Sequence, residues 1–285
     1  MRPTRLAVLV VLLLVPGLLG ANGDATTATT AAGLWAAESS ASIHPGVRTY
    51  AQGAQCTANF VFEQTRTING NNVREVFLGQ AAHCSSKGGS TSTNGCETPT
   101  YPPGTPVEIE GASRVGTMVY NSWHTMQAIN ERDGNTCAYN DFALVKLHPA
   151  DHGKVNPTVP HWGGPTGIAA TTDFGDQVFS YGRSGLRFGL QSEHRGTSLG
   201  TSRDGWTHQV YTVTPGIPGD SGSGFLDRSG RAFGVLSTLQ AAPYAGSNGV
   251  SDIGRSLRYL RAKTSTWDGL VLARGTRGFD GGLLP

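Results

Sequence analysis

The sequence predicts an all-β fold, built as one large or two smaller β domains within 285 residues. Short runs of β-branched and aromatic residues recur between clusters of Gly, Asn and Pro, as in a sandwich or barrel. The 40 glycines and 15 prolines fit many tight turns better than long helices. Helical periodicity occurs in one segment, which Ser251 would cap and in which Ile253, Leu257 and Leu260 share a face.

The start of the chain has the pattern of an export signal. Arg2 and Arg5 precede an apolar run over residues 6–19, whose 14 residues fall short of the roughly 20 that a spanning helix needs. The charged start and the Thr/Ala-rich sequel favour export over a buried helix. We therefore expect residues 1–21 to be a signal peptide of a secreted protein that has no membrane segment after cleavage. Residues 22–45, rich in Ala, Thr and Ser, are predicted to be a propeptide or linker.

The strand pattern begins near residue 47 and continues through most of the chain. The predicted strands are, in order, 59–64, 74–79, 106–111, 115–120, 141–147, 176–182, 208–214 and 231–237. Asp227 to Gly230 is predicted to be a hairpin turn between two apolar arms. Residues 157–167 are the best candidate for a connection between two β halves, and no element is predicted for the Gly-rich residues 267–285.

The charge balance argues against a dedicated nucleic-acid binder. The chain has 22 basic and 20 acidic residues, and removal of residues 1–21 would remove two arginines and no acid. The mature chain would then be nearly neutral. A local basic cluster, formed by Arg255, Arg258, Arg261 and Lys263, fits the solvated side and C-terminal end of the predicted helix. We expect the protein to be a monomer.

Four cysteines lie in the first half of the chain, at positions 56, 84, 96 and 137. An even number in an exported protein favours two disulfides, and the spacing alone leaves three connectivities open. The sequence contains no Cys-x-x-Cys and no His/Cys spacing of a zinc site. We therefore predict no metal and no cofactor.

Three motifs contain the residues of a possible nucleophilic site. The sequence PGDSGSG places Ser221 among glycines, LGQAAHC places His83 after an apolar strand, and NDFALVKL places Asp141 at the head of another. A serine hydroxyl is a poor nucleophile until an imidazole accepts its proton, and a buried carboxylate keeps that imidazole in the required tautomer. The glycines would let the amides of Gly219 and Ser221 converge on an oxyanion, each worth on the order of 3 kcal/mol.

Each motif alone has an ordinary explanation, as a turn, a half-buried histidine or a turn-capping acid. Together, and in the order His, Asp, Ser, the motifs AAHC, NDFALVKL and GDSGSG resemble the chymotrypsin-like (trypsin-fold) serine proteases, and more narrowly their secreted bacterial branch. The resemblance covers about residues 46–262 as motifs and spacing.

This resemblance implies two orthogonal six-stranded antiparallel β-barrels, with the catalytic residues in the cleft between them, and a short C-terminal helix. We accordingly expect an N-terminal barrel over residues 46–160 that carries His83 and Asp141. A second barrel with the helix would occupy residues 161–266 and carry Ser221, and residues 267–285 would form a tail.

The resemblance also implies individual roles. His83 would be the general base, Asp141 its orienting acid and Ser221 the nucleophile, with oxyanion amides from Gly219 and Ser221. The family's histidine-loop disulfide corresponds to Cys56–Cys84, which leaves Cys96–Cys137 as the second pair.

Two features depart from the animal enzymes of this family. The sequence has no Ile-Val-Gly-Gly-like segment ahead of the first strand, whose freed amine would pair with the acid that corresponds to Asp220. A carboxylate buried without a partner is costly. We therefore expect an ion pair between Arg183 and Asp220, the alternative being an exposed Arg183.

The second departure concerns specificity, for which the candidate substrate-binding residues are Pro215, Ser237, Thr238 and Leu239. Pro215 stands where trypsin-like members carry an acid, so specificity for Lys or Arg is not expected. Leu239 replaces a pocket-wall glycine and would favour small or medium apolar side chains, unless it is packed in the core. Leu236 stands where glutamate-specific relatives carry a histidine, which argues against specificity for acidic side chains.

The sequence thus predicts a secreted serine endopeptidase that cleaves peptide bonds through an acyl-enzyme. The alternatives are a catalytically silent binding protein with the same fold and an esterase that uses the same triad. The residue order and the missing last glycine of G-x-S-x-G argue against the α/β-hydrolase type of esterase.

Overall fold

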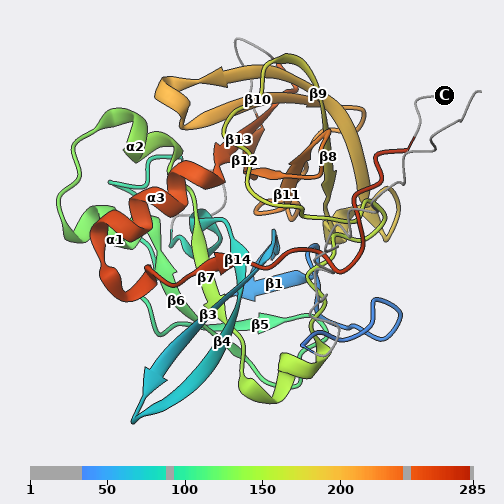
Figure 1. The fold of residues 1–285 in the computed structure, drawn as a ribbon. Coiled ribbons are helices and arrows are strands. Elements are labelled where there is room, and N and C mark those ends of the chain that lie inside the picture. The colour runs from blue at the N-terminus through green and yellow to red at the C-terminus, as the bar shows by residue number, and fades with distance from the viewer. Residues whose placement is uncertain (1–33, 88–92, 240–244, 283–285) are drawn as a thin grey trace, which may run out of the picture. The chain divides into compact units, whose positions relative to one another are not determined.

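The structure is a computed structural model that describes residues 34–87, 93–239 and 245–282. The predicted signal peptide and the first part of the predicted propeptide lie outside the described residues. The all-β prediction is confirmed, because the described residues form two antiparallel sheets and only short helices (Figure 1). None of its described helices has the length and apolar character that a membrane span requires.

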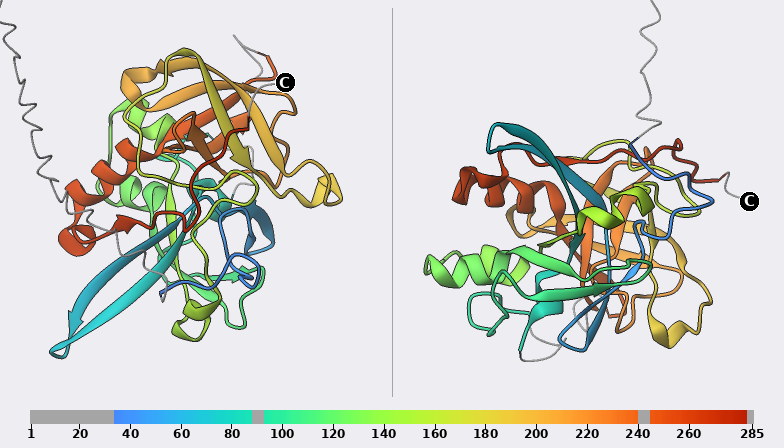
Figure 2. Two further views of the ribbon diagram at one scale, coloured as in Figure 1. Left: turned by 45° about the vertical axis from the view of Figure 1, so that its right-hand side comes forward. Right: turned by 90° about the horizontal axis from the view of Figure 1, so that it is seen from below.

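The first sheet is a curled, open sheet with the strand order β14-β3-β4-β7-β6-β5-β1-β2. The β3–β4 hairpin is its longest feature and extends well beyond the other strands (Figures 1 and 2). The strands β1 and β2, joined by a short turn, were not predicted. The bounds are β1 Arg48–Ala51, β2 Ala54–Thr57, β3 Val61–Ile68, β4 Asn71–Gln80, β5 Pro106–Ile109, β6 Gly116–Asn121, β7 Ala143–Lys146 and β14 Val271–Leu272.

The second sheet is a closed barrel with the order β10-β13-β12-β11-β8-β9. Its β11–β12 hairpin contains the predicted turn, in which the Asp227 carboxylate accepts hydrogen bonds from the amides of Ser229 and Arg231. The polar strands β9 and β13 were not predicted. The bounds are β8 Phe174–Tyr181, β9 Glu193–Ser202, β10 Thr207–Thr212, β11 Gly224–Asp227, β12 Ala232–Leu239 and β13 Asn248–Asp252.

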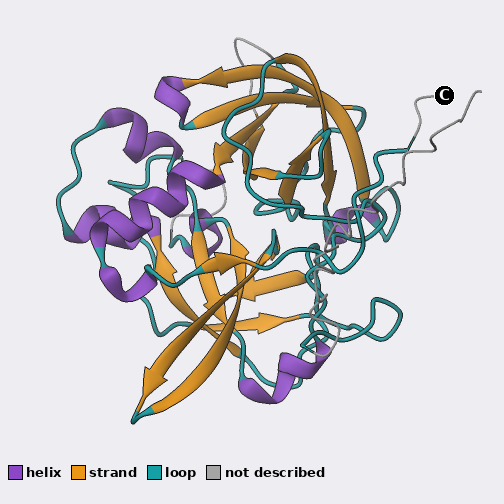
Figure 3. Cartoon of the chain, in the orientation of Figure 1, coloured by secondary structure: helices purple, strands orange, loops and turns teal. Residues whose placement is uncertain are grey.

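The α-helices lie together on one side of the sheets, whereas 3₁₀ turns are scattered over the molecule (Figure 3). The predicted helix is α3, Ile253–Lys263, but its cap is Asp252, whose carboxylate accepts from the Arg255 amide at 2.5 Å. Ser251, the expected cap, belongs to β13. Two helices were not predicted: α1 Ser122–Ala128 and α2 Gly134–Tyr139.

A continuous apolar core joins the two sheets. One cluster of buried side chains contains Phe62 and Phe77 of the first sheet, Phe179 and Leu226 of the barrel, and Leu257 of α3. Each such side chain stabilises the fold by about 1.5–3 kcal/mol relative to exposure. This shared core fixes the two sheets to each other and therefore fixes the groups at their boundary.

Both ends of the described chain are packed into the fold. Residues 34–45, expected to have little to bury, contain the fully buried Ile43, and the Ala36 amide donates to Val155 at 2.9 Å. The tail, for which no element was predicted, adds β14 to β3 and then runs along the segment between the two sheets, where the Asp280 amide donates to the Trp162 carbonyl at 2.7 Å. Residues 34–45 are therefore part of the folded unit, contrary to the expectation for that part of the predicted linker.

Candidate active site

The imidazole of His83 lies against the carboxylate of Asp141. His83 is in a 3₁₀ turn, Ala82–Ser85, that follows β4, and its Nδ1 is 2.7 Å from Asp141 Oδ2. The His83 backbone amide donates to the other carboxylate oxygen at 2.9 Å. The Ser122 hydroxyl fixes the segment around Asp141 by donating to the Asn140 carbonyl and accepting from the Phe142 amide. Both side chains of the pair are buried.

The pair is electrostatically self-consistent. Burial by itself lowers the pKa of His83, but the charge of Asp141 and the hydrogen bond to it outweigh burial and raise the pKa above the ordinary 6.5. Burial raises the pKa of Asp141, but the His83 charge and hydrogen bonds from His83 and Ser237 hold it below the ordinary 3.8. The Ser237 hydroxyl donates to Asp141 Oδ2 at 2.5 Å. The arrangement keeps Asp141 ionised and able to stabilise an imidazolium.

Ser221 lies at the boundary of the two sheets, beside the His83 segment. The Thr57 amide donates to the Ser221 carbonyl at 2.8 Å, and the neighbouring Cys56 is bonded to Cys84. A Cβ on Gly222 would lie 3.0 Å from the Ala81 nitrogen, so the chain after Ser221 packs directly against the approach to His83. No hydrogen bond joins Ser221 to His83, and among the described residues the buried Nε2 has no partner. This nitrogen is available as a proton acceptor.

The predicted oxyanion amides have no hydrogen-bond acceptor in the described part of the chain. Asp220 and Gly222 donate to Ile217 and Leu236, whereas the amides of Gly219 and Ser221 on either side of Asp220 do not donate. Gly219 has a φ of +99°, in the left-handed region that favours glycine. Two free amides flanking a buried acid are suited to stabilise an anion next to the Ser221 hydroxyl.

The expected ion pair between Arg183 and Asp220 is wrong, because Arg187 occupies that position. Arg187 Nε and Nη2 lie 3.0 and 2.7 Å from Asp220 Oδ2, and Asp220 is 1 % exposed. Arg183 instead contacts Glu110, with Nη1 at 3.2 Å from Oε2. The 3₁₀ turn Gly185–Arg187 reverses the chain and returns the second arginine to the acid. The loop contains two arginines four residues apart, and the sequence could not distinguish them.

A cavity of about 310 Å³ lies beside Ser221. The predicted residues Ser237, Thr238 and Leu239 line it, but Pro215 does not. The Pro215 carbonyl instead accepts a hydrogen bond from Arg187 at 2.6 Å. Leu239 is 56 % exposed, which rules out the alternative that it is packed in the core. Leu236, noted above as a specificity position, also lines the cavity, and the lining residues that were not predicted are Thr93, Gly216, Ile217, Pro218 and Asn248.

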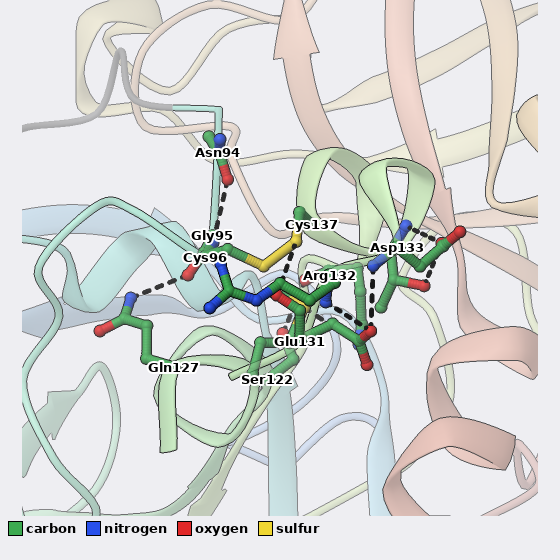
Figure 4. The surroundings of a disulfide bond; sticks show 12 residues. Asn94, Gly95, Cys96, Ser122, Gln127, Glu131, Arg132, Asp133 and Cys137 are labelled. Atoms are coloured by element: carbon green, nitrogen blue, oxygen red, sulfur yellow. Dashed lines mark hydrogen bonds between the residues drawn. A yellow bond between two sulfur atoms is a disulfide. The ribbon is translucent and has the colours of Figure 1, made fainter. Parts of the chain in front are cut away.

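Both disulfides implied by the resemblance are present. The potential ligand atoms of Cys56, His83 and Cys84 lie within 4.8 Å of one another, but the two sulfurs are bonded to each other and so are not thiolate ligands. Cys96–Cys137 ties the segment 93–98 to α2, in which Cys137 lies four residues before Asp141 (Figure 4). The Gln127 side chain donates to the carbonyls of Gly95 and Thr98 in this segment. These contacts hold residues 93–98 next to the cavity.

A second buried histidine–aspartate pair, which was not predicted, lies inside the barrel. His208 Nε2 is 2.9 Å from Asp252 Oδ2, and His208 Nδ1 is 2.9 Å from the Thr172 hydroxyl. Both nitrogens of this imidazole have partners, and Asp252 also caps α3. The pair is therefore a structural element, in contrast to His83, whose Nε2 is unpaired.

Comparisons with known proteins agree with this architecture. A closed six-stranded barrel, a curled second sheet and a histidine–aspartate pair at their boundary define the trypsin fold of the chymotrypsin-like serine proteases, and this chain has that fold. Thermobifida fusca protease A superimposes with a TM-score of 0.52 and 20 % identity, over 82 % of this chain and all of that one.

Two further solved proteases are similar at lower scores. A glutamic acid specific serine protease has a TM-score of 0.49 and 18 % identity over 81 % of this chain and 100 % of that one. A Nocardiopsis protease has a TM-score of 0.48 and 17 % identity over 81 % of this chain and 98 % of that one. No family model and no curated protein sequence matches the chain.

Proposed function

We propose that this protein is a serine endopeptidase that hydrolyses peptide bonds through an acyl-enzyme. His83 acts as general base, Asp141 orients and stabilises its imidazolium, and Ser221 attacks the scissile carbonyl. The amides of Gly219 and Ser221 stabilise the oxyanion of the tetrahedral intermediate. The observation that carries the proposal is the buried imidazole with Nδ1 on a carboxylate at 2.7 Å and an unpaired Nε2, with Ser221 on a segment that packs against the residues before His83.

Covalent labelling of the purified secreted form with a fluorophosphonate probe tests this function directly. We expect modification at Ser221, located by peptide mass spectrometry, together with turnover of a chromogenic peptide panel. Ser221→Ala should abolish both, whereas Ser223→Ala, two residues further on, should retain labelling. A folded protein without labelling or turnover would instead support the silent binding protein.

The specificity we propose is for small or medium apolar side chains before the scissile bond. Leu239 lines the 310 Å³ cavity, and Leu236 supplies a second apolar surface there. No carboxylate lines the cavity among the described residues, so a Lys or Arg side chain would lack a counter-charge.

Leu239→Gly is expected to widen the cavity and to shift preference towards aromatic side chains. Because each methylene in such a pocket is worth about 1–3 kcal/mol, kcat/KM for Phe relative to Ala should rise by about 10–200-fold. The measurement is the ratio of kcat/KM values on matched peptides that differ at this one position. An unchanged ratio would show that Leu239 does not limit the pocket.

The activity is expected to fall at acid pH with a midpoint above 6.5. The raised pKa of His83 keeps the imidazole protonated to a higher pH than usual, and a protonated imidazole cannot accept the Ser221 proton. Activity is therefore lost as pH falls through this raised pKa, and Asp141→Asn should move the midpoint of the residual activity to lower pH. The pH profile of kcat/KM measures both; a midpoint below 6.5 in the unsubstituted protein would contradict the assignment.

We further propose that the protein is exported and acts outside the cell as a monomer on protein or peptide substrates. The signal-like pattern of residues 1–21 and two disulfides support export, since disulfides persist in oxidising compartments. N-terminal sequencing of the secreted form would test it. Because Ile43 is built into the fold, we expect the first residue of that form to lie before residue 43.

A further inference from the structure

The peptide that presents the Gly219 amide lies at the centre of a tight turn. The Asp220 amide donates to the Ile217 carbonyl at 2.9 Å, Pro218 is the second residue, and Gly219, the third, has a φ of +99°. These features define a type II turn. Type I and type II turns differ by a rotation of the central peptide, here Pro218–Gly219, and a glycine in the third position tolerates both. The Pro-Gly sequence favours type II but permits both, so contacts with the rest of the chain also decide which way the Gly219 amide points.

Ser184 holds the carbonyl of that same peptide. Its hydroxyl donates to the Pro218 carbonyl at 2.5 Å. Because this peptide is trans, the Gly219 amide points away from the Pro218 carbonyl, and so away from Ser184. Rotation of the peptide to the type I form would break this hydrogen bond and turn the amide towards Ser184.

Ser184 is itself held firmly. The side chain is 1 % exposed, its hydroxyl accepts from the Leu186 amide at 3.1 Å, and its backbone amide donates to Asp220 Oδ1 at 2.9 Å. A Cβ on Gly219 would lie 3.0 Å from the Ser184 hydroxyl and 2.8 Å from the Gln55 amide nitrogen. These contacts leave the hydroxyl little freedom to follow a rotating peptide.

The next carbonyl along the chain is also fixed. The Gly219 carbonyl accepts from Thr57 Oγ1 at 2.8 Å and from Gln55 Nε2 at 3.0 Å. Those two donors come from β2, whereas Ser184 comes from the β8–β9 loop. The Gly219–Asp220 peptide is thus fixed independently, and Ser184 supplies the hydrogen bond that holds the Pro218–Gly219 peptide.

We propose that Ser184 is a positioning residue for the oxyanion site, which keeps the Pro218–Gly219 peptide in the type II orientation so that the Gly219 amide faces the developing oxyanion. This inference rests on the proposed peptidase function for its kinetic consequence. Ser184 contacts no reacting atom, and it acts through the Pro218 carbonyl. The oxyanion forms only on the way to the tetrahedral intermediate, so the effect belongs to turnover and not to ground-state substrate binding.

The kinetic test compares Ser184→Ala, Ser184→Thr and the unsubstituted protein. Ser184→Ala is expected to lower kcat by about 10–100-fold, less than the roughly 10²–10³ that loss of an oxyanion donor costs. KM should stay within about twofold. Affinity for a peptidyl boronic acid, which forms a tetrahedral adduct, should fall in parallel with kcat, while affinity for the product peptide should not change. Ser184→Thr, which keeps the hydroxyl, should restore most of kcat.

Ser192→Ala is the matched control, because Ser192 lies in the same β8–β9 loop and its hydroxyl makes no hydrogen bond with the described residues. It should retain full kcat. A Ser184→Ala protein with unchanged kcat, or with KM and product affinity altered as much as kcat, would overturn the proposal.

A structural measurement separates this proposal from the function it rests on. The nuclear Overhauser effect between Pro218 Hα and the Gly219 amide proton is strong in a type II turn and weak in type I. It should be strong in the unsubstituted protein and in Ser192→Ala, and weakened in Ser184→Ala or, if that variant does not fold, in Ser184→Cys, whose thiol is a weak donor. If the unsubstituted protein has no activity, the peptidase proposal fails and this effect still decides the role of Ser184. A nuclear Overhauser effect as strong in the Ser184 variant as in Ser192→Ala would refute the proposed role of Ser184.

Discussion

Replacing His83 by alanine is expected to reduce turnover by about 10⁶-fold, and adding Ser221→Ala to the same protein is expected to cost almost nothing more. The hydroxyl is nucleophilic only while an imidazole accepts its proton, so the two residues act as one unit. The measurement is kcat of each single variant and of the double variant on one peptide substrate. Asp141→Asn should cost less, about 10⁴-fold, because the imidazole remains but is no longer held in the required tautomer.

The second buried pair provides the control for this prediction. His208→Gln disturbs an equally buried histidine–aspartate contact, at 2.9 Å, but one that lies away from the cavity. It should lower the free energy of unfolding while the folded molecules keep their kcat. Additive losses in the His83 and Ser221 variants, or an equal loss of kcat in His208→Gln, would contradict the proposed roles.

The sequence predicted those parts of the site that are encoded locally. A glycine-flanked serine, a histidine after an apolar strand and an aspartate at the head of another are each recognisable from a few neighbouring residues. All eight predicted strands overlap observed ones, because each is a short run of β-branched and aromatic residues bounded by turn residues. The assignment of Ser221 as nucleophile and the bounds of the two barrels remain predictions.

The features that were missed depend on contacts between distant segments. Strand β9 has the polar sequence EHRGTSLGTS and is a strand because β8 and β10 pair with it on both sides. The segment 34–45, which contains Ile43, and the tail have too few apolar residues for the sequence to show that they pack against the rest of the fold. Ser184 is an unremarkable loop serine in the sequence, and its significance depends on a carbonyl 34 residues away. Tertiary context decides each of these cases.

Tertiary contacts also decide that Arg187, and not Arg183, pairs with Asp220, and this pairing leads to the second prediction with a large expected effect. Arg187→Met is expected to lower the free energy of unfolding by about 3–5 kcal/mol, because it leaves the buried Asp220 carboxylate without a counter-charge. Arg183→Met removes an ion pair to Glu110 that is partly open to solvent, so the expected loss is about 0–1 kcal/mol. Urea unfolding in a Ser221→Ala background measures both without self-digestion.

A double-mutant cycle identifies the partner of the carboxylate. Once Arg187→Met has removed the guanidinium, Asp220→Asn should cost less than it does alone, and the cycle should give a coupling of about 0.5–3 kcal/mol. With Arg183→Met in place of Arg187→Met, the coupling to Asp220 should be near zero. A large coupling through Arg183 would show that the two arginines exchange roles in solution.

Loss of the Arg187 contact would also release the turn after Ile217, whose amide donates to the same carboxylate at 3.1 Å. Because that turn carries the Gly219 amide, the Arg187→Met protein that remains folded should have a lower kcat than Arg183→Met.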